Sequence, residues 1–342
     1  MMNNRVLEED VRQFAEHFEL RKDLWGKSFL ITGGTGLIGS ILVKCLLALN
    51  EDIRITIPVR DEKKARTIFS DDINKLDVII APSLEDWSKS IRRPFNYIIH
   101  CASPTAGKYM EGNPVETFCM TYEVTNNLLR LARDTETDSF VFVSSLEYYG
   151  QIMDERLIVE SDQGYINLLS ARSSYPMGKR VGEYLCYAFA KEYGVHARSA
   201  RLTQTFGAGV SPNDNRVFAQ FVRSVIKGED VVLHTMGDSA KPYCYTTDAV
   251  SAILHILLRG KDGESYNVAN EATYISIKDL AEFLRDNFNP CINVHIELKD
   301  NMGYAPVTKL RLSTKKLRDL GWKPRYGLKD MFRRLICSIS NR

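Results

Sequence analysis

The sequence has no run of about 18 apolar residues, so no membrane-spanning helix and no membrane partner are expected. It has no excess of charge of one sign: 45 Lys and Arg stand against 43 Asp and Glu, whereas a nucleic-acid-binding protein would usually be more basic. The seven cysteines are scattered without a close pair, which predicts neither a metal site nor a disulfide framework. The N-terminus lacks the basic start and apolar centre of a secretory signal, so we expect a cytoplasmic, reduced protein.

What the sequence does contain is an alternation of short apolar runs and helical patterns over its first two thirds. Runs such as DVIIA, YIIHCA and FVFVSS are apolar on both faces, as buried parallel strands are. The predicted strands are 28–32, 53–59, 77–81, 95–101, 139–145 and 197–202, and the predicted helices are 36–49, 114–133 and 175–193. This alternation predicts an α/β fold with a doubly wound parallel sheet.

A cluster of glycines lies between the first predicted strand and the helix that follows it. In TGGTGLIG, residues 32–39, Gly33 permits a tight turn, Gly36 leaves room for a pyrophosphate, and Gly39 lets the helix lie close to the sheet. The helix N-terminus would direct unpaired N–H groups at the phosphates. We therefore predict a dinucleotide cofactor, held by Gly33, Thr35, Gly36, Leu37, Ile38 and Gly39.

The end of the second strand bears on which dinucleotide is bound. An acidic residue about twenty positions after the glycines usually binds the adenosine ribose. In PVRDEKKAR that position holds Arg60, which suits a 2′-phosphate, so the sequence favours NADP over NAD. The adjacent Asp61 could still reach a ribose hydroxyl, which keeps NAD open.

A serine, a tyrosine and a lysine form the predicted catalytic group. Tyr175 follows Ser145 by thirty residues, and Lys179 lies four residues further on the same helix face. A phenol is a poor base near neutral pH, but a neighbouring ammonium favours its phenolate. We expect Tyr175 to take a proton from a sugar hydroxyl that Ser145 also contacts, while a nicotinamide takes the hydride.

The same spacing recurs later in the helix, at Tyr187 and Lys191. About three turns, roughly 18 Å, separate the two pairs, so only one pair can face the nicotinamide. Tyr175 begins the helix near the carboxyl ends of the strands, where ligands bind. Tyr187 lies in the apolar run YLCYAFA and is predicted to be a core or interface residue.

Together these motifs resemble the extended short-chain dehydrogenase/reductases, in particular the NAD-dependent epimerase/dehydratase family that modifies nucleotide sugars. The resemblance covers roughly residues 26–335 and rests on TGGTGLIG, HCAS at 100–103, Asn113-Pro114, Ser145 with Gly150, YPMGK and ARLTQTFG. It implies a Rossmann domain, bound NAD(P), a nucleotide-diphosphate sugar and a homodimer formed through helices 114–133 and 175–193. It also implies cofactor contacts from Cys101, Ala102, Ser103, Tyr175 and Lys179.

Within that family, several segments are similar to those of UDP-glucuronate decarboxylases. They are ASPTAGKYMEGNPVETF, YPMGKRVGEYLCYAFAKEYGV, NDNRVFAQFV and RDLGWKPRYGLKDMF. By this resemblance the catalytic Ser/Thr and Glu of the strand end fall on Ser145 and Glu147, and the cation that binds the substrate pyrophosphate falls on Lys241. The expected substrate contacts are Gln204, Arg216, Lys241 and Arg180, the last as a partner for a substrate carboxylate.

The departures from the family pattern leave the product open. Leu146 stands where dTDP-glucose 4,6-dehydratases have the Asp that helps to expel the C6 hydroxyl, although Glu147 could still act as a C5 base. Relatives usually have Asn at the positions of Gln204 and Thr121. After a common oxidation to a 4-keto sugar, decarboxylation, epimerisation or dehydration could follow. An NADPH-dependent nucleotide-sugar reductase, a redox-sensing scaffold and an RNA-associated Rossmann protein are the alternatives.

The texture of the sequence changes after about residue 205, where Gly, Pro, Asn and Asp cluster in FGAGVSPNDNR and MGDSAKPYCYTTD. We expect a strand at 231–235, another near 264–270 that rejoins the main sheet, and helices near 248–258, 276–287, 313–320 and 328–339. This predicts an N-terminal helical extension (1–25), a NAD(P)-binding Rossmann domain (26–205) and a smaller interleaved lobe for the substrate (206–342). Elements near 240–270 return to the Rossmann domain, and a cleft separates the two parts.

Overall fold

The protein is built around a seven-stranded parallel sheet in the order β11-β7-β5-β4-β1-β2-β3. The computed structural model describes residues 4–152, 155–299 and 307–340. The strands are β1 Ser28–Thr32, β2 Arg54–Val59, β3 Leu76–Ile80, β4 Tyr97–His100, β5 Ser139–Ser145, β7 Ala197–Leu202 and β11 Ser265–Val268. The predicted doubly wound sheet is therefore confirmed, including the strand near 264–270 that rejoins it.

Helices cover both faces of this sheet, which explains why its strands are apolar on both sides. One face packs against α1, α2, α3 and α9, and the other against α4, α6 and α7. The bounds are α1 Arg5–His17, α2 Leu37–Leu49, α3 Glu62–Phe69, α4 Leu84–Ser90, α5 Gly107–Gly112, α6 Pro114–Asp134, α7 Ser174–Tyr193 and α9 Thr246–Arg259. Short 3-10 helices are η1 Arg21–Leu24, η2 Ser70–Lys75, η3 Leu146–Tyr149 and η4 Ala171–Ser173. None of the described helices is long and apolar enough to cross a membrane.

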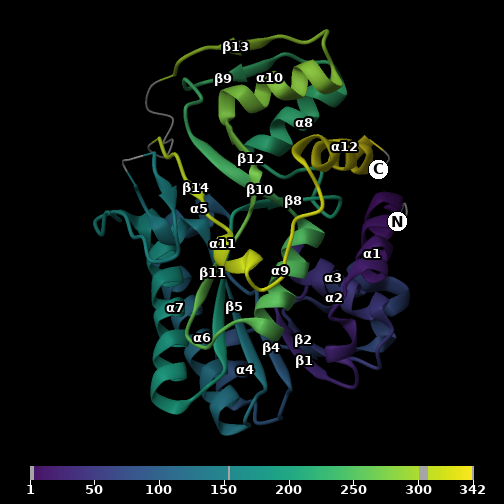
Figure 1. Ribbon diagram of the computed structural model, residues 1–342, viewed down its shortest axis with the longest axis vertical. Coiled ribbons are helices and arrows are strands. Elements are labelled where there is room, and N and C mark those ends of the chain that lie inside the picture. Colours follow the sequence, from purple (N-terminus) through teal and green to yellow (C-terminus); the bar gives the residue numbers. More distant parts are fainter. Residues whose placement is uncertain (1–3, 153–154, 300–306, 341–342) are drawn as a thin grey trace.

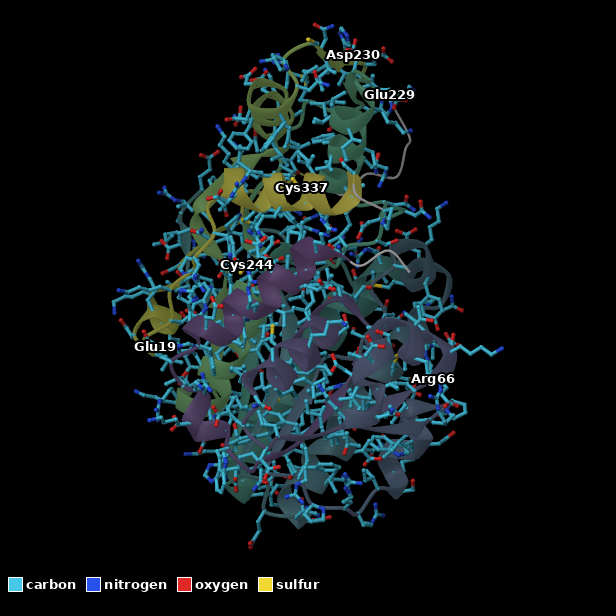
Figure 2. The ribbon with its side chains drawn as sticks, turned by 90° about the vertical axis from the view of Figure 1, so that its right-hand side faces the viewer. Glu19, Arg66, Glu229, Asp230, Cys244 and Cys337 are labelled. Atoms are coloured by element: carbon cyan, nitrogen blue, oxygen red, sulfur yellow. The ribbon has the colours of Figure 1, made fainter. Side chains whose placement is uncertain are left out.

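A smaller lobe with its own apolar core lies beyond the carboxyl ends of the strands (Figure 1). Its sheets are β8-β10-β12, β9-β13 and β6-β14. The strands are β6 Leu157–Ile158, β8 Gln204–Phe206, β9 Val231–Leu233, β10 Ala240–Tyr245, β12 Asn270–Ser276, β13 Val294–Ile296 and β14 Arg311–Leu312. The helices are α8 Val217–Lys227, α10 Ile277–Phe288, α11 Lys315–Arg318 and α12 Leu328–Ser340. Figure 2 shows Asp230, just before β9, at the far tip of this lobe.

Two details of the lobe differ from the prediction. No strand was predicted in MGDSAKPYCYTTD, but Ala240–Tyr245 forms β10, which pairs with both β8 and β12. The helix predicted at 313–320 is reduced to the single turn of α11, and Gly321 soon afterwards has the left-handed φ of 96°. The predicted parts 1–25 and 206–342 include residues 1–3, 300–306 and 341–342, which lie outside the described residues.

The N-terminal helix joins the main sheet to the lobe. Its apolar side packs on the sheet domain, where Phe14 and the following Phe18 are both buried. Its buried Asp10 accepts hydrogen bonds from Arg334 Nε on α12 at 2.6 Å and from the Tyr245 hydroxyl on β10 at 2.6 Å. Figures 1 and 2 show α1 lying beside α12. A buried ion pair therefore attaches the extension to the lobe.

We predict that Arg334→Met lowers the free energy of unfolding by about 3–5 kcal/mol, because it leaves the Asp10 carboxylate buried without its cation. Urea unfolding measures the effect. The control is Arg333→Met, since Arg333 forms an exposed ion pair with Asp330, and its loss should cost less than about 1 kcal/mol. Equal destabilisation by the two variants would show that the buried pair does not attach α1.

Candidate active site

A cavity of about 2820 Å³ lies between the carboxyl ends of the strands and the lobe. Every site residue predicted from the sequence lines it except Arg180. They are Gly33, Thr35, Gly36, Leu37, Ile38, Gly39, Arg60, Cys101, Ala102, Ser103, Ser145, Glu147, Tyr175, Lys179, Gln204, Arg216 and Lys241. The cavity therefore has room for a dinucleotide together with a second large ligand.

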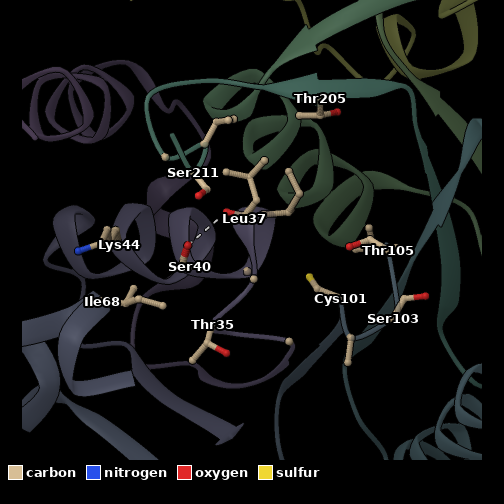
Figure 3. Close-up of a pocket in the computed structure, with 18 of the residues that line it drawn as sticks. Thr35, Leu37, Ser40, Lys44, Ile68, Cys101, Ser103, Thr105, Thr205 and Ser211 are labelled. Carbon is tan, nitrogen blue, oxygen red and sulfur yellow. Dashed lines mark hydrogen bonds between the residues drawn. The ribbon is translucent and has the colours of Figure 1, made fainter. Parts of the chain in front are cut away.

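The glycine-rich turn is packed so closely that side chains are excluded. Gly33 has a φ of 70°, and a Cβ on it would lie 2.7 Å from the Ala102 nitrogen. A Cβ on Gly39 would lie 2.2 Å from the Gly33 carbonyl oxygen. No side chain caps the N-terminus of α2, so its first N–H groups face the cavity unpaired, which fits a bound pyrophosphate. Figure 3 shows Thr35 and Leu37 of this segment around the same hollow as Cys101.

Arg60 and Asp61 have different surroundings after the end of β2. Asp61 caps α3, where its Oδ1 accepts a hydrogen bond from the Lys64 N–H at 3.0 Å. Arg60 is exposed, lines the cavity, and forms no ion pair or hydrogen bond with any residue that the structure describes. The capping role occupies the carboxylate and leaves the guanidinium for a ligand.

The structure brings Ser145, Tyr175 and Lys179 together where β5 ends and α7 begins. The Tyr175 ring is buried, and Ser145 lies close enough to its hydroxyl to lower the pKa of the phenol. The Lys179 ammonium lies 5.4 Å from the centroid of the Tyr175 ring and donates to the Val143 carbonyl at 2.8 Å. Tyr187, from the repeated spacing, is 51% exposed and does not line the cavity.

Burial sets the acidity of these groups. It raises the pKa of Tyr175, and the Glu147 carboxylate raises that pKa further, while the Ser145 hydrogen bond and the Arg172 charge lower it. Burial also lowers the pKa of the Lys179 ammonium to about 8. Burial is thus the main cause that keeps the phenol protonated, and the Ser145 hydrogen bond and the Arg172 charge oppose it.

Arg172 is a site-region residue that the sequence did not indicate. Its Nη2 donates to both carboxylate oxygens of Glu147 at 2.7 Å, and its guanidinium carbon lies 5.7 Å from the centroid of the Tyr175 ring. The one available signal was its position three residues before Tyr175 in SARSSYP. Its pairing with Glu147 depends on how the chain folds and could not be read from spacing.

Cations and an amide reach the cavity from the lobe. Gln204 lies on β8 and Lys241 on the neighbouring β10. Burial lowers the pKa of Lys241, and Glu147 acts in the opposite direction; within the described residues, the Lys241 ammonium has no ion pair or hydrogen bond. Arg216 is paired with Asp214 at 2.7 Å. Of Lys241 and Arg216, Lys241 is therefore the cation that is more available to an anionic ligand.

Arg180 was predicted to bind a substrate carboxylate, but the structure does not bring it into the cavity. Its guanidinium donates to the backbone carbonyls of Tyr148 and Gly164, both at 2.7 Å. As the residue next to Lys179 on a helix, its side chain is turned about 100° away from the cavity. Arg180 therefore supports the η3 turn that carries Glu147.

The fold is shared with solved nucleotide-sugar enzymes. A UDP-glucose 4-epimerase from Thermotoga maritima, solved with UDP-glucose, matches with a TM-score of 0.73 and 20% identity, covering 92% of this chain and 98% of that one. A dTDP-glucose 4,6-dehydratase from Streptomyces venezuelae, solved with NAD and TYD bound, matches with a TM-score of 0.73 and 22% identity, covering 92% and 97%.

Sequence similarity extends over most of the chain. UDP-glucuronic acid decarboxylase 5 from Arabidopsis thaliana is 28% identical over 306 residues, which cover 88% of this chain and 86% of the relative. The model of the NAD dependent epimerase/dehydratase family matches residues 29–269, more than half of the chain and all of the catalytic group described above. The protein is therefore a member of the NAD dependent epimerase/dehydratase family.

Proposed function

We propose that the protein is an NAD(P)-dependent enzyme that converts a nucleotide-diphosphate sugar through a 4-keto intermediate, and that it decarboxylates a UDP-hexuronate such as UDP-glucuronate. The observation that carries the proposal is the meeting of Ser145, Tyr175 and Lys179 in one cavity with the glycine-rich turn and with Lys241 of the lobe. The similarity to UDP-glucuronic acid decarboxylases over most of the chain supports the substrate class.

In the first step, Tyr175 removes the proton of the sugar 4-hydroxyl. When bound, the nicotinamide accepts the hydride from C4 and later returns it. Ser145 contacts the oxygen that becomes the carbonyl, and the Lys179 ammonium, 5.4 Å from the centroid of the Tyr175 ring, provides positive charge beside the phenolate. Tyr175 and Ser145 thus act on the same sugar oxygen, and Lys179 acts on Tyr175, which agrees with the position of all three at the junction of β5 and α7.

The second step favours loss of CO2 over loss of water. A 4-keto sugar with a C6 carboxylate is a β-keto acid, whose C5–C6 bond breaks with the electron pair passing toward the C4 carbonyl, so no acid is needed to expel a leaving group. Dehydration needs a proton donor for the C6 hydroxyl, and Leu146 offers none beside Glu147. Epimerisation at C4 is the second candidate, because it needs only the same Ser145, Tyr175 and Lys179.

A panel of UDP-, dTDP-, GDP- and CDP-sugars decides among these products. Mass spectrometry of each reaction separates loss of CO2, loss of water and no change in mass, and NMR of the last class identifies an epimer. The proposal requires loss of CO2 from a UDP-hexuronate. Mass spectrometry of the cofactor that copurifies with the protein identifies NAD or NADP.

The roles of the segments of the chain and its cellular compartment are further parts of the proposal. We propose that residues 26–205 mainly hold the cofactor, that 206–342 mainly hold the substrate, and that 1–25 form a helical extension. All seven cysteines are free, which suits a reducing compartment, and we propose the cytoplasm.

We also propose a homodimer formed through α6 and α7, because these helices expose Val115, Tyr122 and Tyr184 on one side of the protein. Light scattering after gel filtration should give a mass near twice the 38.9 kDa of the chain. The double variant Tyr122→Lys/Tyr184→Lys should be monomeric, since it places charge in the apolar contact. Val232→Lys, which alters an exposed apolar residue on β9 of the lobe, is the control; a monomeric wild type would contradict the proposal.

We predict that Tyr175→Phe lowers kcat by at least about 100-fold, because the variant keeps the ring and loses the proton acceptor. Cofactor binding, measured by fluorescence titration, should remain. Tyr187→Phe is the matched control, since it makes the same change on the same helix outside the cavity. Full turnover by Tyr175→Phe would instead support a cofactor-binding scaffold.

We predict that the protein prefers NADP and that Arg60→Ala removes the preference. Loss of a charge-assisted contact to the 2′-phosphate should weaken NADP binding between about 10- and 100-fold and leave NAD binding nearly unchanged. Isothermal titration with both cofactors measures this. Lys63→Ala changes a cation on α3 that does not line the cavity, and it should alter neither affinity. Equal losses for NAD and NADP in Arg60→Ala would argue against a 2′-phosphate contact.

A further inference from the structure

We propose that Arg172 is a positioning residue that allows a base and a carboxylate to work side by side: it holds the Glu147 side chain in place and offsets the repulsion between Glu147 and the phenolate of Tyr175. The inference rests on the proposed function, because it concerns proton removal by Tyr175. Arg172 itself does not line the cavity, so it acts through the two residues that do.

The contacts of Arg172 place its charge between the two groups. One nitrogen, Nη2, donates to both oxygens of Glu147 at 2.7 Å. The guanidinium carbon lies 5.7 Å from the centroid of the Tyr175 ring, and the Lys179 ammonium lies 5.4 Å from the same centroid. The phenol thus has two cations near it, one from η4 and one from α7, and one anion from η3.

A third contact fixes the guanidinium. Arg172 Nη1 lies 3.9 Å from the sulfur of Met110, which is buried on α5. The neighbouring Lys108 and Tyr109 of α5 line the cavity. Arg172 therefore joins α5, η3 and α7 at the cavity wall, and its position is set from three sides.

The negative charge of Glu147 explains why Tyr175 and Glu147 need Arg172 beside them. Glu147 raises the pKa of Tyr175, and Arg172 lowers it. Without the arginine, removal of the phenol proton would create a second anion beside a carboxylate, and like charges disfavour this. Lys241 on β10 is a further cation near Glu147, whose charge raises the pKa of Lys241 against the effect of burial, which lowers it. Lys241 is not among the groups that shift the pKa of Tyr175.

The test is a double-mutant cycle read by pH dependence. With the nucleotide sugar that the wild type converts fastest, kcat/KM is measured from pH 5 to 10 for wild type, Arg172→Met, Glu147→Gln and the double variant. Arg172→Met should move the rising limb at least about one pH unit upward and lower kcat/KM at pH 7 by about tenfold or more, because the phenol then ionises later. In the double variant the limb should return to its position in Glu147→Gln.

Two further variants separate charge from structure. Arg172→Lys should restore most of the wild-type pH profile, since it keeps the charge. Arg259→Met removes an exposed arginine that pairs with Asp23 and does not line the cavity, and it should leave the profile unchanged. If Arg172→Met lowers activity at all pH values equally, and Glu147→Gln does not move its limb back, Arg172 has only a structural role and the proposal is overturned.

A second readout does not need turnover. If the wild type converts no sugar of the panel, the proposed function fails, and ionisation of Tyr175 is then followed at 295 nm with NAD(P)+ added, against Tyr175→Phe as blank. The proposal requires the tyrosine to ionise at higher pH in Arg172→Met than in the wild type. Identical titrations in the two proteins would overturn it independently of the enzyme assay.

Discussion

The buried ion pair between Arg201 and Glu183 fixes the position of the catalytic helix. Arg201 on β7 donates to Glu183 on α7 at 2.7 Å, and both side chains are almost fully buried. Ser144 on β5 and Ser265 on β11 also donate to this carboxylate. Three strands thus hold α7 at one point, one helical turn after Lys179. Because removal of one partner would leave an uncompensated buried charge, the register of α7 against β5 is strongly constrained.

Close packing of α7 completes that constraint. A Cβ on Gly182 would lie 2.5 Å from the Phe142 ring, and one on Gly178 would lie 3.2 Å from Thr121 of α6. Gly182 lets the helix approach β5 closely enough for Lys179 to reach the Val143 carbonyl, and Gly178 lets it lie against α6. The phenol and the serine hydroxyl meet because the backbone of α7 has little freedom to lie elsewhere.

Features that depend on a few neighbouring residues could be predicted from the sequence. Contacts between residues far apart in the chain could not. The glycine-rich turn and the Tyr175–Lys179 spacing were predicted because chain geometry over a few residues determines both. The strands were predicted because burial on two faces leaves apolar runs. Arg172 escaped notice because its partner lies 25 residues earlier in the chain, and the attachment of α1 through Arg334 spans 324 residues. Arg180 was assigned to the cavity because residue type alone does not tell which side of a helix faces a ligand.

The distribution of charged residues in the cavity links the geometry of the site to its substrate. Glu147 is neutralised by Arg172 and Asp214 by Arg216, so neither carboxylate repels an anion at full strength. Among the described residues Lys241 has no such partner, and its burial makes an unpaired ammonium costly. A ligand that brings negative charge beside Lys241 therefore gains the interaction that the protein leaves open, and a sugar diphosphate with a carboxylate supplies negative charge at both of its ends. The cavity that holds the base on one side thus offers an unpaired cation to an anionic ligand from the lobe.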